Sequence, residues 1–254
     1  AEGLPYALTL LGILGVVTFA QFRAARRHGV EVGFPHFIPF PFWLGTLGAF
    51  VQLRSFLPSR KAVFDVSAAG PLAALAIAVP ALLLGLQWST PVAVVSGTMP
   101  VAGTAVGSSL VLALLAKLSL GSALTYSSVL QLHPVAFAGW LGLLLTGLNL
   151  LPIGGLAGGH LAQSLFGTRR AAGIGSGVLV GLLVLALLVW PGLMFWALLA
   201  FLFAGTDAPP RDDVTPVGRG RRWLGVALLV LGALILLPLP HALWTSTGFR
   251  CPYV

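Results

Sequence analysis

Charged residues are scarce in this chain. They make up 8% of its 254 residues, whereas 57% are hydrophobic and the mean hydropathy is +0.99. A soluble domain carries about 25% charged residues, because it needs a polar surface around its core. This composition excludes a soluble globular protein and predicts an integral membrane protein that crosses the bilayer several times.

Acidic residues and cysteine are rarer still. There are six Asp and Glu against 14 Lys and Arg, and Cys251 is the only cysteine. One cysteine excludes a disulfide framework and a cysteine zinc site within the chain. The basic residues stand in short clusters between apolar runs, as the positive-inside rule produces, so we expect no nucleic-acid partner. The first residues lack an initiator Met and a basic region, so we interpret them as the cut end of a longer chain rather than a signal peptide.

The apolar runs are long enough to define membrane spans. A helix needs about 20 apolar residues to cross the hydrocarbon core. The sequence predicts spans at residues 5–22, 62–87, 133–153, 173–190 and 223–245, with a short apolar run at 191–205. The Trp190-Pro191-Gly192 triplet interrupts a run too long for one span, so we expect a helical hairpin over 173–205.

The basic clusters give the orientation of the spans. Four clusters occur, and the rule places all of them on the cytoplasmic side: 23–27, 54–61, 169–170 and 211–222. Under that constraint the weak apolar run at 102–120 cannot cross, so we expect it to be re-entrant or interfacial. The result is an all-α polytopic membrane protein of about six transmembrane helices, forming one integral-membrane domain over 1–254.

Two segments differ from the apolar runs. Residues 30–56 are rich in Pro, Gly, Phe and Val and alternate in part, which predicts a small membrane-associated β-hairpin or sheet. Its open edge must be covered or must face a wet cavity, where it can accept an extended peptide. Residues 206–222 are polar and contain three prolines, which predicts a cytoplasmic linker before the last helix.

A glycine-rich stretch follows the third predicted span. Asn149 lies in an apolar run, Pro152 frees a backbone carbonyl, and Gly154 and Gly155 interrupt the helix before His160. Two interpretations are open. The stretch is either an unwound loop facing an internal site, or a plain helix end followed by a turn at the interface.

These stretches together resemble a known family. Residues 11–42, 44–74 and 133–167, supported by 211–222, are similar to the site-2 proteases, in their bacterial and plastid branch. The most specific match is Asn-x-x-Pro-x-x-x-Leu-x-Gly-Gly-His, which ends at His160. The resemblance implies an intramembrane zinc metalloprotease fold. In the family, a His-Glu-x-x-His helix supplies two ligands and the general base, and an aspartate of the glycine-rich loop is the third ligand.

The chain departs from the family at each catalytic position. The resemblance places Val17 and Gln21 at the two histidines, Thr18 at the glutamate and Ala157 at the aspartate. Val and Ala cannot bind zinc, Gln is a poor ligand, and Thr is no base at neutral pH. We therefore expect no intact catalytic residue and no zinc in this chain. His160 and His28 are weak candidates for a metal ligand.

Two further residues bear on these assignments. Arg23, Arg26 and Arg27 would repel a cation at His28, so we interpret that histidine as an interfacial polar residue. Asp65 follows Arg60 and Lys61 by about one helical turn, which favours an ion pair or an interface anchor there.

Three functions are compatible with the sequence. The first is an inactive site-2 protease homologue, a pseudoprotease of regulated intramembrane proteolysis. It would keep a substrate groove at Asn149, Pro152, Gly154 and Gly155, and its partners would be transmembrane peptides, membrane lipid and an active homologue. The second is an active metalloprotease with a noncanonical site. The third, a transporter or channel, is disfavoured because intramembrane charge pairs and repeats are lacking. We expect a multi-pass protein of the bacterial inner membrane or a plastid membrane.

Overall fold

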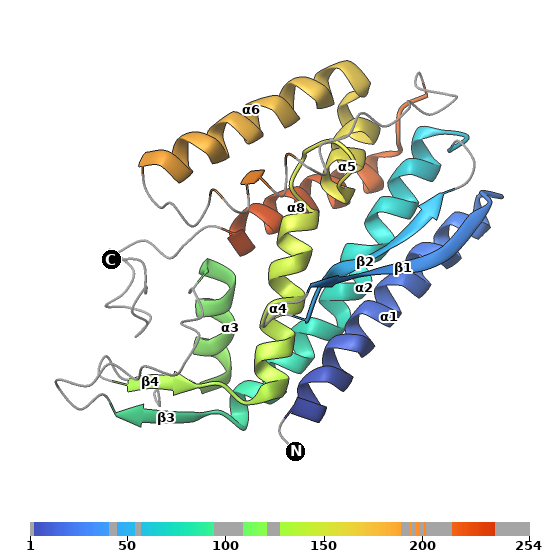
Figure 1. Cartoon of the computed structure of the whole chain (residues 1–254). Helices are drawn as coiled ribbons and strands as arrows, with labels where there is room; N and C mark the ends of the chain where they lie inside the picture. The colour runs from blue at the N-terminus through green and yellow to red at the C-terminus, as the bar shows by residue number, and fades with distance from the viewer. Residues whose placement is uncertain are drawn as a thin grey trace.

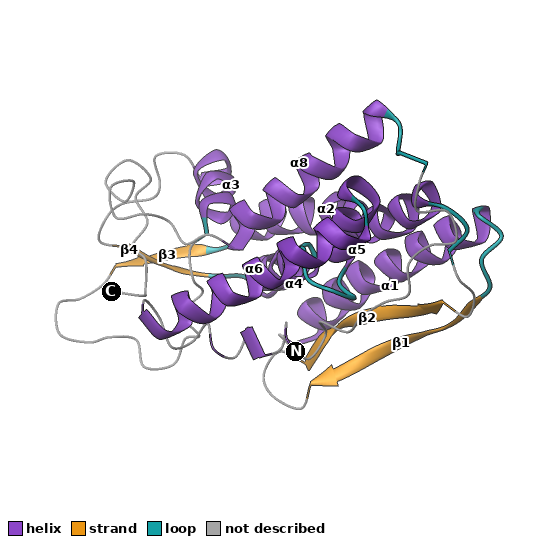
Figure 2. Cartoon of the chain, turned by 90° about the horizontal axis from the view of Figure 1, so that it is seen from above, coloured by secondary structure: helices purple, strands orange, loops and turns teal. Residues whose placement is uncertain are grey.

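The fold is a helical bundle with two small two-stranded sheets (Figure 1, Figure 2). The computed structural model describes residues 3–40, 45–53, 57–93, 109–120, 128–188, 194, 197–198, 201 and 215–236. The helices are α1 (Gly3–Arg27), α2 (Arg60–Gln87), α3 (Leu110–Leu120), α4 (Pro134–Asn149), α5 (Ala157–Phe166), α6 (Thr168–Leu188) and α8 (Arg219–Leu236). The strands are β1 (Val32–Phe40), β2 (Gly45–Leu53), β3 (Thr90–Ala93) and β4 (Ser128–Gln131).

Helices α1, α2 and α4 form the centre of the bundle. Ile13 of α1 and Ala78 of α2 both pack over Gly142 of α4, and their side chains are buried in one cluster. The Tyr6 and Phe137 rings lie 5.6 Å apart near the starts of α1 and α4, so these two helices run parallel. α2 runs antiparallel to both, because Gln21 near the end of α1 packs on Gly70 near the start of α2.

Glycines allow α2 and α4 to approach closely. A Cβ added at Gly85 would lie 2.2 Å from the backbone nitrogen of Ala136, and one at Gly139 would lie 2.6 Å from the nitrogen of Leu82. Small residues at a helix interface permit this kind of backbone contact in membranes, where packing rather than the hydrophobic effect holds helices together. α2 and α4 thus form a rigid pair around which the other helices pack.

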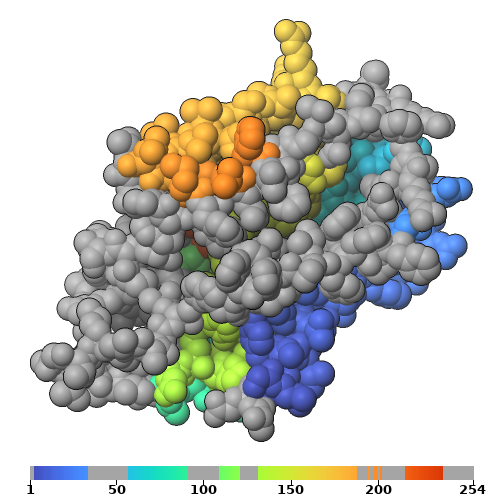
Figure 3. Space-filling model, viewed as in Figure 1, coloured from blue at the N-terminus to red at the C-terminus, as the bar shows by residue number. Residues whose placement is uncertain are grey.

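The outer helices cover this centre from different sides. α8 packs across α2 and α4, since Gly225 meets the Phe64 ring and Gly232 meets the side chain of Leu150. α3 lies against the second half of α2, where the Ser119 hydroxyl donates to the carbonyl of Leu83 at 3.2 Å. α6 runs over the surface and leaves most of its apolar side chains exposed (Figure 3).

The basic clusters meet at one end of the bundle. Arg221 at the start of α8 and His28 just after α1 both bind Asp65 near the start of α2. The start of α6 is also close, because a Cβ at Gly167 would lie 2.8 Å from a guanidinium nitrogen of Arg60. The described basic residues at these helix ends therefore share one end of the bundle, as the predicted orientation requires.

The structure confirms part of the predicted span pattern. Three described helices are long and apolar enough to cross a membrane: Gly3–Arg27, Arg60–Gln87 and Thr168–Leu187. They contain the predicted spans 5–22 and 62–87 and most of 173–190. The predicted span 133–153 is a shorter helix that ends at Asn149, because the glycine-rich stretch interrupts it. Six crossings and a re-entrant 102–120 remain predictions, and the described part of that segment is the 11-residue helix α3.

The predicted hairpin at 30–56 is present. β1 and β2 pair antiparallel, with Val32 opposite Leu53 and Phe40 opposite Gly45. Register shifts occur beside Pro35 and Pro39, because proline has no N–H for the ladder. The hairpin runs along α1 (Figure 2). A second two-stranded antiparallel sheet, of β3 and β4, was not predicted.

The described residues only partly cover the C-terminal predictions. α8 begins at Arg219, so the last four residues of the predicted linker 206–222 are helical. Residues 206–214, most of 191–205 and the end of the predicted span 223–245 lie outside the described residues. The linker and the full crossing of the last helices stay predictions.

Candidate functional site

The glycine-rich stretch forms a tight loop between α4 and α5. α4 ends at Asn149, and α5 begins at Ala157. Leu150 and Ile153 anchor the loop, with relative exposures of 1% and 2%, whereas Gly154 and Gly155 are exposed. Gly154 has φ +39°, a conformation that L side chains rarely adopt. The helix is thus broken as both interpretations require, and its glycines present bare backbone.

The side chain of Asn149 joins the two ends of the loop. Its Oδ1 accepts a hydrogen bond from the backbone nitrogen of Ala157 at 3.1 Å. The N-cap residue of α5, Leu156, makes no side-chain cap, so Asn149 satisfies a helix N–H that Leu156 cannot. The sequence pointed to Asn149 as a substrate-binding residue, and its capping role was missed.

Two glycines fix α5 against the loop. A Cβ at Gly158 would lie 2.0 Å from the carbonyl oxygen of Leu150, and one at Gly159 would lie 2.1 Å from the carbonyl oxygen of Gly154. The obstructing atoms are backbone, which cannot rotate away as a side chain can. The Gly-Gly pair is therefore required for the position of α5. Pro152 is also close-packed, since its carbonyl oxygen lies 2.9 Å from a Cβ built at Gly175 of α6.

Three of the four predicted catalytic positions lie on α1. Val17 and Thr18 are buried, and Gln21 is half-buried one turn later. The Thr18 hydroxyl lies 3.0 Å from the Leu14 carbonyl oxygen and 2.9 Å from that of Gly15, and it donates to its own helix backbone. The amide of Gln21 fills the space above Gly70, where a Cβ would be 2.5 Å from its Nε2.

The fourth position, Ala157, is buried at the start of α5. Helices α1 and α5 both pack on the first turns of α2. Gln21 lies over Gly70, and Leu161 of α5 belongs to the same buried cluster as Phe64 and Ala68. The four positions thus come from two helices that share one supporting helix.

The side chains at these positions do not fit zinc. Val17 and Ala157 have hydrocarbon side chains, Thr18 has a neutral hydroxyl that donates to backbone carbonyls, and Gln21 has a neutral amide, so none of the four side chains is an imidazole, thiolate or carboxylate. A zinc site needs three or four nitrogen, sulfur or carboxylate ligands. Among the residues that the structure describes, no three His, Cys, Asp or Glu side chains come together as a metal site. We derive no metal-dependent step for this chain.

The two candidate histidines lie in different settings, and His160 follows Ala157 by about one helical turn. His160 is half-buried on α5, and its backbone nitrogen donates to Leu156 at 3.1 Å. The Nε2 of His28 lies 2.9 Å from Oδ2 of Asp65 and donates to it. One carboxylate and one imidazole make half of a zinc site at most.

Asp65 forms an ion pair, but its partner was predicted wrongly. The expectation was Arg60 or Lys61, one turn away. Arg221 instead donates to both carboxylate oxygens, with Nε 2.8 Å from Oδ1 and an Nη nitrogen 3.0 Å from Oδ2. The two residues are 156 positions apart, so no local spacing could identify the pair. The only sequence signal was a carboxylate in an apolar run, which demands a partner.

Comparison with known proteins identifies the family of this chain. The chain has apolar helices long enough to span a membrane and a broken helix whose glycine-rich loop packs on α2. The profile described as "Peptidase family M50" matches residues 6–190. The chain belongs to this family, the site-2 protease family.

Two of the similar curated proteins are named as chloroplastic zinc metalloproteases. "Probable zinc metalloprotease EGY1, chloroplastic" of Arabidopsis thaliana is 36% identical over 248 residues, covering 96% of this chain and 44% of that protein. "Probable zinc metalloprotease EGY3, chloroplastic" of Oryza sativa subsp. japonica is 33% identical over 282 residues, covering 100% of this chain and 45% of the relative. The chain thus spans less than half the length of these relatives. No solved structure matches it significantly.

Proposed function

We propose that this chain is an inactive member of the site-2 protease family that binds transmembrane peptides without cleaving them. The proposal rests on two properties of the site. The side chains of Val17, Thr18, Gln21 and Ala157 supply no good zinc ligand and no general base, and the helices around them are closely packed. Thr18 donates its hydroxyl proton to its own helix, and Gln21 is packed on Gly70. The side chains at these positions therefore pack or bond within the bundle. An active zinc protease would instead have metal-binding side chains there.

The peptide would bind at the exposed part of the α4–α5 loop. Gly154 and Gly155 are exposed there, and the loop is held by buried Leu150 and Ile153. Bare backbone on a rigid support can pair with an extended peptide. The β1–β2 hairpin, which has two unpaired edges in the described sheet, is a second place for such pairing.

The chain would cross its membrane six times, with the basic end of the bundle on the cytoplasmic or stromal side. The meeting of the basic clusters at one end supports this orientation. The relatives' names place them in chloroplasts, and a plastid or bacterial inner membrane suits the same topology. An active homologue is a possible partner for an inactive copy.

A cleavage assay with restored residues tests the catalytic part. The unmodified chain should not cleave a model transmembrane peptide in proteoliposomes. The combined variant Val17→His, Thr18→Glu, Gln21→His and Ala157→Asp should bind zinc and gain cleavage that a chelator abolishes. The matched control omits Thr18→Glu, so it should bind zinc and cleave nothing. Chelator-sensitive cleavage by the unmodified chain would instead establish an active protease with a noncanonical site.

Photocrosslinking tests the binding part separately. A photoreactive residue at exposed Gly155 should crosslink to a transmembrane peptide in the same vesicles. The control position is Gly177 on α6, where nothing lies within 4 Å of a built Cβ. Equal labelling at the two positions would contradict a peptide site at the loop.

A further inference from the structure

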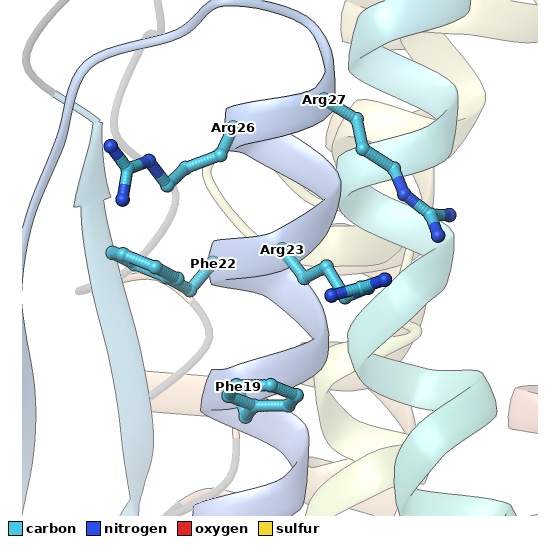
Figure 4. A pocket seen from close by; sticks show the side chains of 5 residues that line it. All are labelled: Phe19, Phe22, Arg23, Arg26 and Arg27. Carbon is cyan, nitrogen blue, oxygen red and sulfur yellow. The ribbon is translucent and has the colours of Figure 1, made fainter.

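The C-terminal end of α1 carries an open cavity that the proposed peptide site does not use. Its volume is about 390 Å³, and it is lined by Phe19, Phe22, Arg23, Arg26 and Arg27 (Figure 4). Arg26 and Phe22 lie on one flank of this side of the helix and Arg23 and Arg27 on the other, and the Phe19 ring lies further toward the helix start (Figure 4). The cavity therefore combines cationic and aromatic side chains.

The five residues occupy one side of α1. Their spacing of three, four, seven and eight positions from Phe19 is the helical repeat that brings side chains to one face. The same side continues toward the helix start with Leu4, Leu8 and Leu11, which are 66%, 62% and 59% exposed. An apolar stripe thus leads directly into the arginine cluster.

The three arginines are exposed and have no acidic partner in the described part of the chain. Arg26 stacks on Phe22, with its guanidinium carbon 5.5 Å from the ring centroid, which leaves its N–H edge open. Arg221, by contrast, is held by Asp65 through two hydrogen bonds. The positive-inside rule explains three charges at this end of a span, but not their gathering around one cavity.

The dimensions of this face match one leaflet of a bilayer. From Leu8 to Phe19 the helix rises about 16 Å. Half of a hydrocarbon core is about 15 Å thick. A lipid whose acyl chains lie on the leucine stripe would place its phosphate level with the guanidinium groups, while Phe19 and Phe22 lie at the boundary.

We propose that this cavity binds the headgroup of an anionic phospholipid. Guanidinium groups match phosphate oxygens in bidentate geometry and are less strongly hydrated than ammonium groups. A free phosphate ion or a soluble acidic peptide would use the arginines but not the apolar stripe. The site is independent of whether the chain cleaves peptides.

Lipid retention in native mass spectrometry tests the proposal. The protein, purified in mild detergent, is titrated with phosphatidylglycerol and phosphatidylcholine in equal amounts. The unmodified chain should retain phosphatidylglycerol preferentially. Arg23→Gln, Arg26→Gln and Arg27→Gln together should weaken that retention roughly a hundredfold, since each basic residue near anionic lipid strengthens binding about fivefold. Arg26→Gln alone should weaken it roughly fivefold, which keeps the test valid if the triple variant fails to fold.

The control removes the same charge elsewhere. Arg169→Gln, Arg170→Gln and Arg222→Gln change exposed arginines on α6 and α8 at the same end of the bundle, and retention should stay within twofold of the unmodified chain. An equal loss in both triple variants would overturn the proposal, because net charge alone would then explain binding. Displacement of the lipid by millimolar inorganic phosphate would also overturn it, since the ligand would then be a free anion. Lack of preference for phosphatidylglycerol in the unmodified chain would do the same.

Discussion

Replacing Gly158 by alanine tests the packing that holds the α4–α5 loop. The added methyl carbon would lie 2.0 Å from the Leu150 carbonyl oxygen, 2.3 Å from its carbonyl carbon and 2.4 Å from the Leu151 oxygen. All three atoms are backbone, and Leu150 is buried, so α5 must move by more than 1 Å to relieve the overlap. Overpacking of this kind costs about 3 kcal/mol.

The assay is thermal unfolding in detergent, followed by circular dichroism. For a chain of this size, about 3 kcal/mol lowers the apparent Tm by about 6–12 °C. Gly177→Ala is the control, because open space surrounds that position and alanine favours the helix. Its Tm should be unchanged or slightly raised. A Tm of Gly158→Ala within 2 °C of the unmodified chain would refute the close approach of α5 to the loop.

Three further substitutions have defined outcomes. Asp65→Asn removes the charge that binds Arg221 and should lower the Tm by about 3 °C, because these partly exposed groups contribute only about 1 kcal/mol; no change would mean that the pair does not join α2 to α8. Asn149→Ala removes the cap on Ala157 and costs about 1 kcal/mol, seen as faster hydrogen exchange at the first α5 amides; unchanged exchange would exclude the cap. Gly85→Ala should lower the Tm by several degrees, since its methyl group meets the α4 backbone; an unaltered Tm would argue against the α2–α4 contact.

Patterns that depend on nearby residues predicted much of the fold. The apolar runs located α1, α2 and most of α6, because a span is defined by its own length and composition. The Pro- and Gly-rich alternation at 30–56 located the β1–β2 hairpin. The Asn149–Pro152 stretch marked the break between α4 and α5. Each feature is encoded within one continuous segment.

Features that join distant segments were not predicted. The Asp65–Arg221 pair depends on how α8 crosses α2, and spacing along the chain carries no information about that crossing. β3 and β4 pair although α3 lies between them in the sequence, so no turn motif indicated that they would form a sheet. The length of α4 was overestimated, because hydropathy continues through Leu150 and Leu151 while the backbone has already left the helix.

At the candidate site, too, the sequence predicted the positions and the structure revealed their contacts. The resemblance selected Val17, Thr18, Gln21 and Ala157 from motif positions alone. The structure adds what each does locally: Thr18 bonds to its own helix, and Gln21 packs on Gly70. The arginine cavity at the end of α1 was present in the sequence as a basic cluster. The proposal of a lipid site needed the structure, which places these arginines on the same face of α1 as Phe19 and the exposed leucines.

The central claim is that this family member has a metalloprotease framework without a metal site. Elemental mass spectrometry of the detergent-purified chain, after exhaustive washing, tests it most directly. We predict zinc far below one atom per chain, and close to one atom per chain in the variant with Val17→His, Thr18→Glu, Gln21→His and Ala157→Asp. Near-stoichiometric zinc in the unmodified chain would mean that a metal site is present.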